Sequence, residues 1–317
     1  MGNEQANSQP PLPVVQSSRI TEGSDAVHRP AVFYDVLEPA SGASRTPIMM
    51  IHGGAHTGAC YLSTVDGRPG WAHYFAARGH RVLVPDWPGS GRSGGVPLDL
   101  LDGALIHQSL AGVLQAAAEP AIVVSHSMGG TFGWKLLETH GHQIRKLIAV
   151  APAPPGNIQR APIVVSRNVD HVDVLQPAGK LRFSVDSPFF PPRAWAEAKL
   201  IGTGTQFPVE HRESYLAGLQ PIAPRVALER ANVDSKQLRV TDFSGYAQKP
   251  VLLIVGADDL DHSETTDRPI VNWLNAIGAH ASFLALGERG ITGNGHMLMM
   301  ERNSDAIADI LADWIGS

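Results

Sequence analysis

Ser127 lies where a short apolar run, residues 121–125, changes into a helical pattern over residues 128–140. Small residues stand two positions before it, at Ser125, and two positions after it, at Gly129. A tight turn between a strand and a helix requires such small neighbours, and it leaves the hydroxyl of the central serine exposed at the end of the strand. The spacing therefore predicts a serine nucleophile at position 127, although the usual pattern has glycine where this chain has Ser125.

His296 is the histidine best placed to act as a base. It ends the segment Gly293-Asn-Gly-His296, which follows the last apolar run and precedes the last helical pattern. A loop in that position can reach back over the edge of a sheet, where a neutral imidazole would take the proton of the serine hydroxyl. His52 and His56 are four residues apart but lie in a turn without a carboxylate, so the pattern does not indicate a zinc site.

A glycine-rich turn, His52-Gly-Gly54, follows an early apolar run. Such a turn can direct a main-chain N–H group at the negative oxygen that develops during acyl transfer, and Gly54 is the expected donor. Met128 follows the expected nucleophile at the N-terminal end of a helix, where the helix dipole also favours negative charge. The N–H groups of Gly54 and Met128 are therefore predicted to form an oxyanion hole.

The chain has 317 residues, a hydrophobic fraction of 43% and a formal net charge of −5. It is long enough to bury a large core, as one domain or as one domain with an insertion. It has no basic run, so a nucleic acid partner is not expected, and no apolar run approaches the roughly 18 residues that span a membrane. Because Cys60 is the only cysteine and the N-terminus lacks a secretory signal, we expect a cytoplasmic protein, or a secreted one if a leader has been removed.

Short apolar runs alternate with helical patterns along the chain. The apolar runs are residues 31–37, 47–52, 81–85, 121–125, 146–151, 251–256 and 282–286. The helical patterns are residues 71–78, 100–118, 128–140, 265–276 and 304–315. This alternation predicts an α/β fold with a mostly parallel sheet that is covered by helices on both faces.

Residues 152–249 interrupt the alternation. They contain eleven prolines, scattered aromatic residues, and two helical patterns near 192–201 and 208–219. The segment is too long for an ordinary loop, so we expect an inserted cap or lid. The expected divisions of the chain are a flexible, proline-containing tail at 1–18, a core at 19–151 and 250–317, and the cap at 152–249.

Together these motifs resemble those of the α/β-hydrolase superfamily. The similarity extends from about residue 31 to residue 317 and rests on the turn at 52–54, the run Asp86-Trp-Pro-Gly-Ser-Gly-Arg-Ser93, the turn at Ser127 and the segment that begins at Gly293. The last segment is similar to a branch of bacterial serine esterases that have a long insertion after the sixth strand. Some members of that branch are secreted and dimeric, so a homodimer is a further expectation.

The acidic residue that would orient His296 does not occupy the position that it has in that esterase branch. The branch carries a catalytic glutamate in a Val-Glu-Pro context just after the sixth strand, and this chain has Val150-Ala-Pro152 there. The superfamily's commoner place for the acid is the loop after the seventh strand, which here contains Asp258, Asp259 and Asp261. The Gly-x-x-Asp spacing favours Asp259, and the sequence leaves Asp258 and Asp261 open as alternatives.

The resemblance implies a carboxylic ester hydrolase that acts on small, largely apolar substrates through an acyl-enzyme. Ser127 would be the nucleophile, His296 the base and Asp259 the acid, with no metal or organic cofactor. The same groups would also serve a lactone, amide or carbon–carbon bond hydrolase, and a non-catalytic receptor on this fold is a further alternative.

Overall fold

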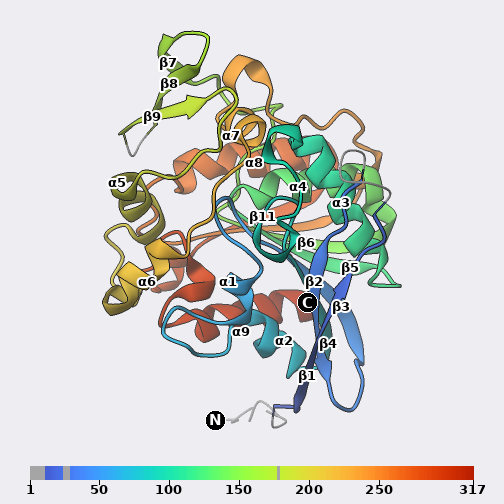
Figure 1. The fold of residues 1–317 in the computed structure, drawn as a ribbon. Coiled ribbons are helices and arrows are strands. Elements are labelled where there is room, and N and C mark those ends of the chain that lie inside the picture. The colour runs from blue at the N-terminus through green and yellow to red at the C-terminus, as the bar shows by residue number, and fades with distance from the viewer. Residues whose placement is uncertain (1–10, 24–28, 177–178) are drawn as a thin grey trace.

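The computed structural model describes residues 11–23, 29–176 and 179–317, and its central element is an eight-stranded sheet (Figure 1). The strands of this sheet are β1 (Val14–Ile20), β2 (Phe33–Pro39), β3 (Arg45–Ile51), β4 (His80–Pro85), β5 (Ala121–His126), β6 (Ile144–Val150), β10 (Pro250–Val255) and β11 (His280–Ala285). Their order across the sheet is β1-β2-β4-β3-β5-β6-β10-β11. Only the pairings of β1 with β2 and of β2 with β4 are antiparallel, so the sheet is mostly parallel, as the alternation predicted.

Helices cover both faces of the sheet, which confirms the expected α/β class. One face packs against α1 (Ala59–Leu62), α2 (Trp71–Ala76) and α9 (Ser304–Gly316). The other face packs against α3 (Gly103–Gln115), α4 (Gly129–His140) and α8 (Glu264–Ala276). Within the described ranges, no helix combines the length and the apolar character that a membrane crossing would need.

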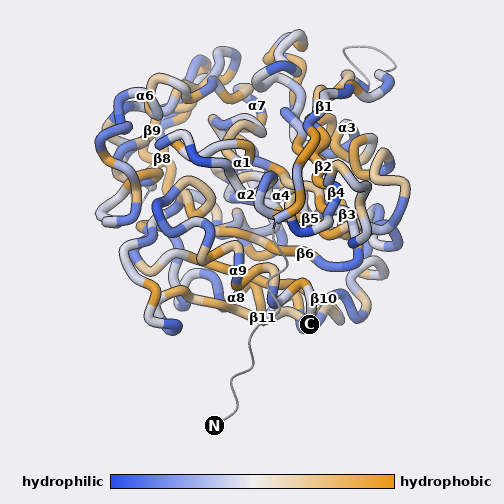
Figure 2. Tube along the Cα trace, turned by 90° about the horizontal axis from the view of Figure 1, so that it is seen from below, coloured by the Kyte–Doolittle hydropathy of each residue, from blue (hydrophilic) through white to orange (hydrophobic). Residues whose placement is uncertain are grey.

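Two hydrophobic layers follow from the alternation of side chains along each strand. In β5, Val123 points into the layer that contains α3, α4 and α8, whereas Ile122 and Val124 point into the layer that contains α2 and α9. Because both faces are buried, the parallel strands are apolar without interruption, and Figure 2 shows hydrophobic segments along the strands of the sheet. This packing fixes the C-terminal ends of β5 and β10, from which the candidate site is built.

The end of the expected N-terminal tail is a strand, so the prediction of a flexible tail over 1–18 is wrong for residues 14–18. β1 pairs antiparallel with β2 over its full length, from Val14 opposite Pro39 to Ile20 opposite Phe33. Most of its side chains are exposed, because it is the edge strand of the sheet. An edge strand can carry polar side chains on both faces, so it lacks the apolar alternation that would have revealed it. Residues 1–10 lie outside the described residues.

The segment between β6 and β10 contributes none of its described strands to the large sheet. It forms a separate three-stranded sheet of β7 (Ile163–Arg167), β8 (His171–Gln176) and β9 (Gly179–Ser184), followed by α5 (Arg193–Ala196), α6 (Arg212–Ala217) and α7 (Pro224–Arg230). Helices α5 and α6 lie where the two helical patterns were expected, and a π-helical turn at Glu197–Ile201 continues α5. In Figure 1 this segment, which we call the cap, lies along one side of the core, with its three strands projecting farthest.

Candidate active site

Ser127 occupies a strained turn between β5 and α4. Its φ of 51° lies in the left-handed region, which residues other than glycine rarely adopt. Two main-chain hydrogen bonds hold it there, since its N–H donates to the carbonyl oxygen of Val150 over 3.0 Å and its own carbonyl oxygen accepts from the N–H of Ala153 over 2.8 Å. The end of β6 therefore maintains the strained conformation that presents the Ser127 hydroxyl.

Glycines on α4 allow the turn to pack closely on the neighbouring strands. A Cβ atom at Gly129 would lie 2.4 Å from the carbonyl oxygen of His52. A Cβ atom at Gly133 would lie 2.8 Å from the Oγ atom of Ser125. Gly133 thus leaves the room that Ser125 requires, which explains how this turn accommodates serine where the usual pattern has glycine.

His296 hydrogen-bonds to both Ser127 and Asp259. Its Nε2 atom lies 2.9 Å from the Oγ atom of Ser127, and its Nδ1 atom lies 2.7 Å from the Oδ2 atom of Asp259. The side chains of His296 and Asp259 are fully buried. The structure therefore brings the three residues that the sequence favoured into one hydrogen-bonded chain, in the order hydroxyl, imidazole, carboxylate.

Burial and neighbouring charges set the protonation states of His296 and Asp259. Burial lowers the pKa of His296 below its ordinary value of 6.5, although the carboxylate of Asp259 acts in the opposite direction. Burial alone would raise the pKa of Asp259, but interactions with the imidazoles of His296 and His262 hold it well below its ordinary value of 3.8. At neutral pH the imidazole is thus neutral and the carboxylate ionised, as proton abstraction from a hydroxyl requires.

The two alternative acids have other partners. The Oδ2 atom of Asp258 accepts a hydrogen bond of 2.9 Å from the N–H of Gly293, and Asp261 forms an ion pair with Lys199. The N–H of Asp261 donates to the Oδ1 atom of Asp259 over 3.0 Å, so this residue helps to orient the carboxylate that contacts His296. Of the three aspartates, the structure joins only Asp259 to the imidazole of His296.

The predicted oxyanion donors, Gly54 and Met128, lie next to each other beside Ser127. All three residues line one pocket, and a Cβ atom at Gly54 would lie 2.7 Å from the Cε atom of Met128. Among the described residues, the N–H groups of Gly54 and Met128 have no hydrogen-bond acceptor. Two main-chain donors are therefore available beside the Ser127 hydroxyl, which is the arrangement that a developing oxyanion needs.

Histidines that the sequence did not assign to catalysis fix the glycine-rich turn. The Nε2 atom of His52 accepts a hydrogen bond from the N–H of Trp87 over 3.3 Å, so its Nδ1 atom carries the proton that is donated to the carbonyl oxygen of Gly53 over 2.8 Å. His56 contacts the carbonyl oxygen of Gly54 through Nδ1 and the hydroxyl of Tyr215 through Nε2, each over 2.8 Å. Since Tyr215 belongs to α6, this second contact joins the cap to the turn that carries Gly54.

Glu301 supports the loop that carries His296, although sequence reasoning did not assign it a role. Its buried carboxylate accepts a hydrogen bond of 2.7 Å from the N–H of Gly295 and another from the side chain of Asn294. Burial raises the pKa of Glu301 to about 7. Its place five residues after His296, in the segment that begins at Gly293, is the sequence feature that could have drawn attention to it.

Asp259, His262 and His296 offer three metal-ligand atoms within 4.8 Å of one another. Hydrogen bonds already engage both ring nitrogens of His296, and the Nδ1 atom of His262 contacts Asp267 over 2.9 Å. A metal ion at this position would have to replace the contact between His296 and Asp259. The hydrogen-bonded arrangement therefore fits proton transfer better than metal binding.

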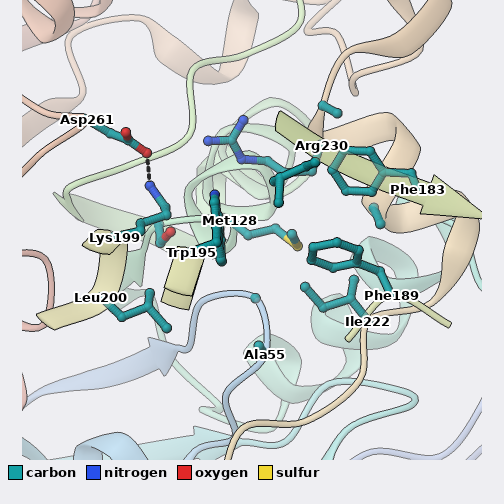
Figure 3. Close-up of a pocket in the computed structure, with 15 residues that line it drawn as sticks. Ala55, Met128, Phe183, Phe189, Trp195, Lys199, Leu200, Ile222, Arg230 and Asp261 are labelled. Atoms are coloured by element: carbon teal, nitrogen blue, oxygen red, sulfur yellow. Dashed lines mark hydrogen bonds and ion pairs between the residues drawn. The ribbon is translucent and has the colours of Figure 1, made fainter. Parts of the chain in front are cut away.

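The pocket above Ser127 is formed jointly by the core and the cap (Figure 3). Its apolar wall includes Phe183, Phe189 and Trp195 from the cap. Three charged side chains also line it, namely Lys199, Arg230 and Asp261. The scattered aromatic residues of 152–249 are evident in the sequence, whereas nothing in it indicated that Lys199 or Arg230 lines this pocket.

A family model described as the alpha/beta hydrolase family matches residues 48–310. This chain belongs to the alpha/beta hydrolase family. The hydrolase is 24% identical over 340 residues to a probable secreted lipase, phiG, from a fungal species, and the match covers 90% of this chain and 85% of that protein.

Solved structures resemble this hydrolase over almost all of its length. A bacterial esterase matches with a TM-score of 0.60 and 17% identity, over 98% of each chain. A methylesterase from Arabidopsis matches with a TM-score of 0.59 and 15% identity, over 86% of this chain and 99% of its own. At these identities the similarity establishes a shared fold.

Proposed function

We propose that this hydrolase is a serine esterase that cleaves carboxylic esters through an acyl-enzyme, with Ser127 as nucleophile, His296 as base and Asp259 as acid. The observation that carries the proposal is the hydrogen-bonded chain from the Ser127 hydroxyl through His296 to Asp259, at 2.9 Å and 2.7 Å. The family, the lipase relative and the esterases of the same fold support ester hydrolysis as the reaction class.

Acylation begins when the Oγ atom of Ser127 attacks the ester carbon while the Nε2 atom of His296 takes the hydroxyl proton. The carbonyl oxygen becomes an oxyanion that accepts hydrogen bonds from the N–H groups of Gly54 and Met128. The bond to the alcohol oxygen then breaks, and His296 gives its proton to the leaving alcohol. Asp259 stabilises the imidazolium that exists between these two transfers.

Deacylation repeats the sequence with water. His296 takes a proton from the water molecule, the hydroxide adds to the acyl carbon, and the Oγ atom of Ser127 leaves with the proton from His296. The products are a carboxylic acid and the free enzyme. The apolar cap residues Phe183, Phe189 and Trp195 would bind the hydrocarbon part of the substrate.

The test is active-site labelling together with a nucleophile variant. A fluorophosphonate probe should label the wild-type protein at Ser127, and Ser127→Ala should abolish labelling and lower kcat on 4-nitrophenyl butyrate by roughly 10⁴ to 10⁶. Circular dichroism checks that the variant is folded. A folded Ser127→Ala protein that retained more than about a tenth of the activity would overturn the assignment.

A further inference from the structure

Arg230 places a positive charge in the pocket beside Ser127. It is the last residue of α7, and its side chain lines the pocket together with the apolar residues Phe183 and Ile222. Figure 3 shows its guanidinium directed toward the part of the pocket where Lys199 and Asp261 lie. Within the residues that the structure describes, that guanidinium donates no hydrogen bond and forms no ion pair.

Three exposed arginines of the cap behave differently. Arg167, Arg182 and Arg193 are exposed, and each forms an ion pair with a carboxylate at 2.9 Å or less. The cap thus provides counter-ions to these three surface arginines, which water would solvate in any case. It provides none to Arg230, which lines the pocket.

The charged groups of the pocket do not cancel. Lys199 and Asp261 form an ion pair with each other, so together they contribute no net charge. Arg230 adds one positive charge, because an arginine side chain stays protonated in proteins. Burial lowers the pKa of Arg230, and the carboxylate of Asp261 acts in the opposite direction without contacting it. The pocket therefore has a net positive charge that no described side chain neutralises.

A role in capping α7 does not account for Arg230. Positively charged side chains near the end of a helix can donate to its last carbonyl oxygens, yet the Arg230 guanidinium makes no such bond within the described chain. The carbonyl oxygens of Ala227 and Glu229 instead accept hydrogen bonds from the N–H of Ala231. The guanidinium is half-buried in a mostly apolar pocket and has no partner among the described residues, so the arrangement points to a ligand that supplies the missing anion.

We propose that the ester substrate also carries a carboxylate, which Arg230 binds at the cap side of the pocket. This proposal rests on the proposed esterase function and adds a substrate class to it. A carboxylate matches the planar guanidinium with two parallel hydrogen bonds, and the aromatic side chains around it would cover the carbon chain that connects the carboxylate to the ester. The half-ester of a dicarboxylic acid has this composition.

The experiment compares two methyl esters of the same length, monomethyl suberate and methyl 8-amino-8-oxooctanoate, in which an uncharged amide replaces the carboxylate. Methanol release gives kcat/KM for each. We expect the wild-type enzyme to prefer the anionic ester by at least tenfold, and Arg230→Gln to lower the ratio of the two kcat/KM values by about 10- to 100-fold. Arg230→Lys should restore part of the ratio, because it keeps the charge but loses the bidentate geometry.

Arg225→Gln is the matched control, because Arg225 lies on the same helix and is exposed. It should keep the wild-type ratio. A wild-type ratio near one, or an equal loss of the ratio in the Arg225 and Arg230 variants, would overturn the carboxylate proposal. If Arg230→Gln does not fold, inhibition of the wild-type enzyme tests the proposal instead. Octanoate should inhibit the hydrolysis of 4-nitrophenyl butyrate at least tenfold better than octanamide does. Equal inhibition by the two compounds would overturn the proposal.

A failure of the proposed esterase function would give a different result. If the protein is not a serine esterase, 4-nitrophenyl butyrate will not be hydrolysed in a manner that depends on Ser127. If only the carboxylate proposal fails, hydrolysis of that neutral ester persists and the preference for an anionic substrate is missing.

Discussion

The side chain of His126 donates a hydrogen bond from Nε2 to the main-chain carbonyl oxygen of His296 over 3.0 Å. Burial lowers the pKa of His126 well below its ordinary value, so the imidazole is neutral when it makes this contact. His126 directly precedes Ser127 in the chain. The bond therefore connects the turn that holds the hydroxyl to the loop that holds the imidazole, two segments that are otherwise far apart in sequence.

Removing this bond should misalign the hydroxyl and the imidazole. We expect His126→Leu to lower kcat/KM on 4-nitrophenyl butyrate about fivefold, which corresponds to the loss of one ordinary hydrogen bond of about 1 kcal/mol. His107→Leu is the matched control, because His107 is also buried and its Nε2 atom contacts the hydroxyl of Thr139, at the opposite end of α4 from Ser127. Equal losses of activity in the two variants would show that His126 acts only through general stability.

The assignment of the acid can be tested by comparing three amides. Asp259→Asn removes the charge that stabilises the imidazolium and permits the wrong tautomer of His296, so kcat should fall by up to about 10⁴. Asp258→Asn and Asp261→Asn should lose less than about tenfold, because their carboxylates contact Gly293 and Lys199 instead. A greater loss at either of these two positions than at Asp259 would transfer the role to that residue.

The pH dependence of kcat/KM should report the burial of His296. Since the base must be neutral, activity should be present above the pKa of His296 and lost as pH falls through it, with a midpoint below the ordinary value of 6.5. The charge of Lys199 contributes to this lowering, so Lys199→Met should move the midpoint to higher pH. A wild-type midpoint at or above 6.5, or a shift to lower pH in the variant, would contradict this account.

Glu229 makes the stability of the fold depend on pH. Burial raises its pKa to about 7, although its carboxylate accepts a hydrogen bond of 2.7 Å from the N–H of Gly103 at the start of α3. An unfolded chain releases this proton near the ordinary value of 4.5, so the free energy of unfolding should fall as pH rises from about 4.5 through about 7. Glu229→Gln should therefore reduce the drop in Tm between pH 5 and pH 8. The exposed Glu119→Gln variant serves as control and should show the same drop as the wild type.

The cap should influence which acyl chains are accepted. Trp195 lines the pocket, so Trp195→Ala should enlarge it and raise kcat/KM for 4-nitrophenyl octanoate relative to acetate by about tenfold. Trp273 on α8 packs against Phe243 and Tyr246, away from the pocket, and Trp273→Ala should leave this ratio unchanged. An equal effect of Trp195→Ala on both esters would mean that the cap is structural rather than selective.

The parts of the site that the sequence could predict are those carried by short, continuous motifs. Ser127 and His296 each lie in a run of small residues between a strand and a helix, because a turn at the end of a parallel strand demands such residues. Asp259 could be favoured by its spacing from Gly256 but not chosen outright. The choice depends on which carboxylate reaches the imidazole, and that is a property of the folded loop.

Arg230 and Lys199 could not be predicted, because no local pattern brings them to the pocket. They reach it through the packing of α7 and of the π-helical turn that follows α5, in a segment whose prolines and short elements have no regular hydrophobic period. The methionine-rich run from Met297 to Met300 adjoins His296 in the chain, but its side chains are buried in the layer with α2 and α9 and do not line this pocket. The roles proposed for the site residues and the expected homodimer remain predictions.

The end of β6 has a consequence for how this enzyme could diversify. Ala151 follows β6 with a φ of 42° and donates its N–H to the carbonyl oxygen of Ile254, so its contribution to the site is made by main-chain atoms alone. The cap begins immediately after it, at a position where the resembling esterases keep a catalytic glutamate. Here the proposed acid, Asp259, follows the neighbouring strand β10, and the point where the insertion leaves the core bears none of the proposed reacting side chains. Evolution could therefore resize the insertion, and with it the range of substrates, while Ser127, His296 and Asp259 stay in place.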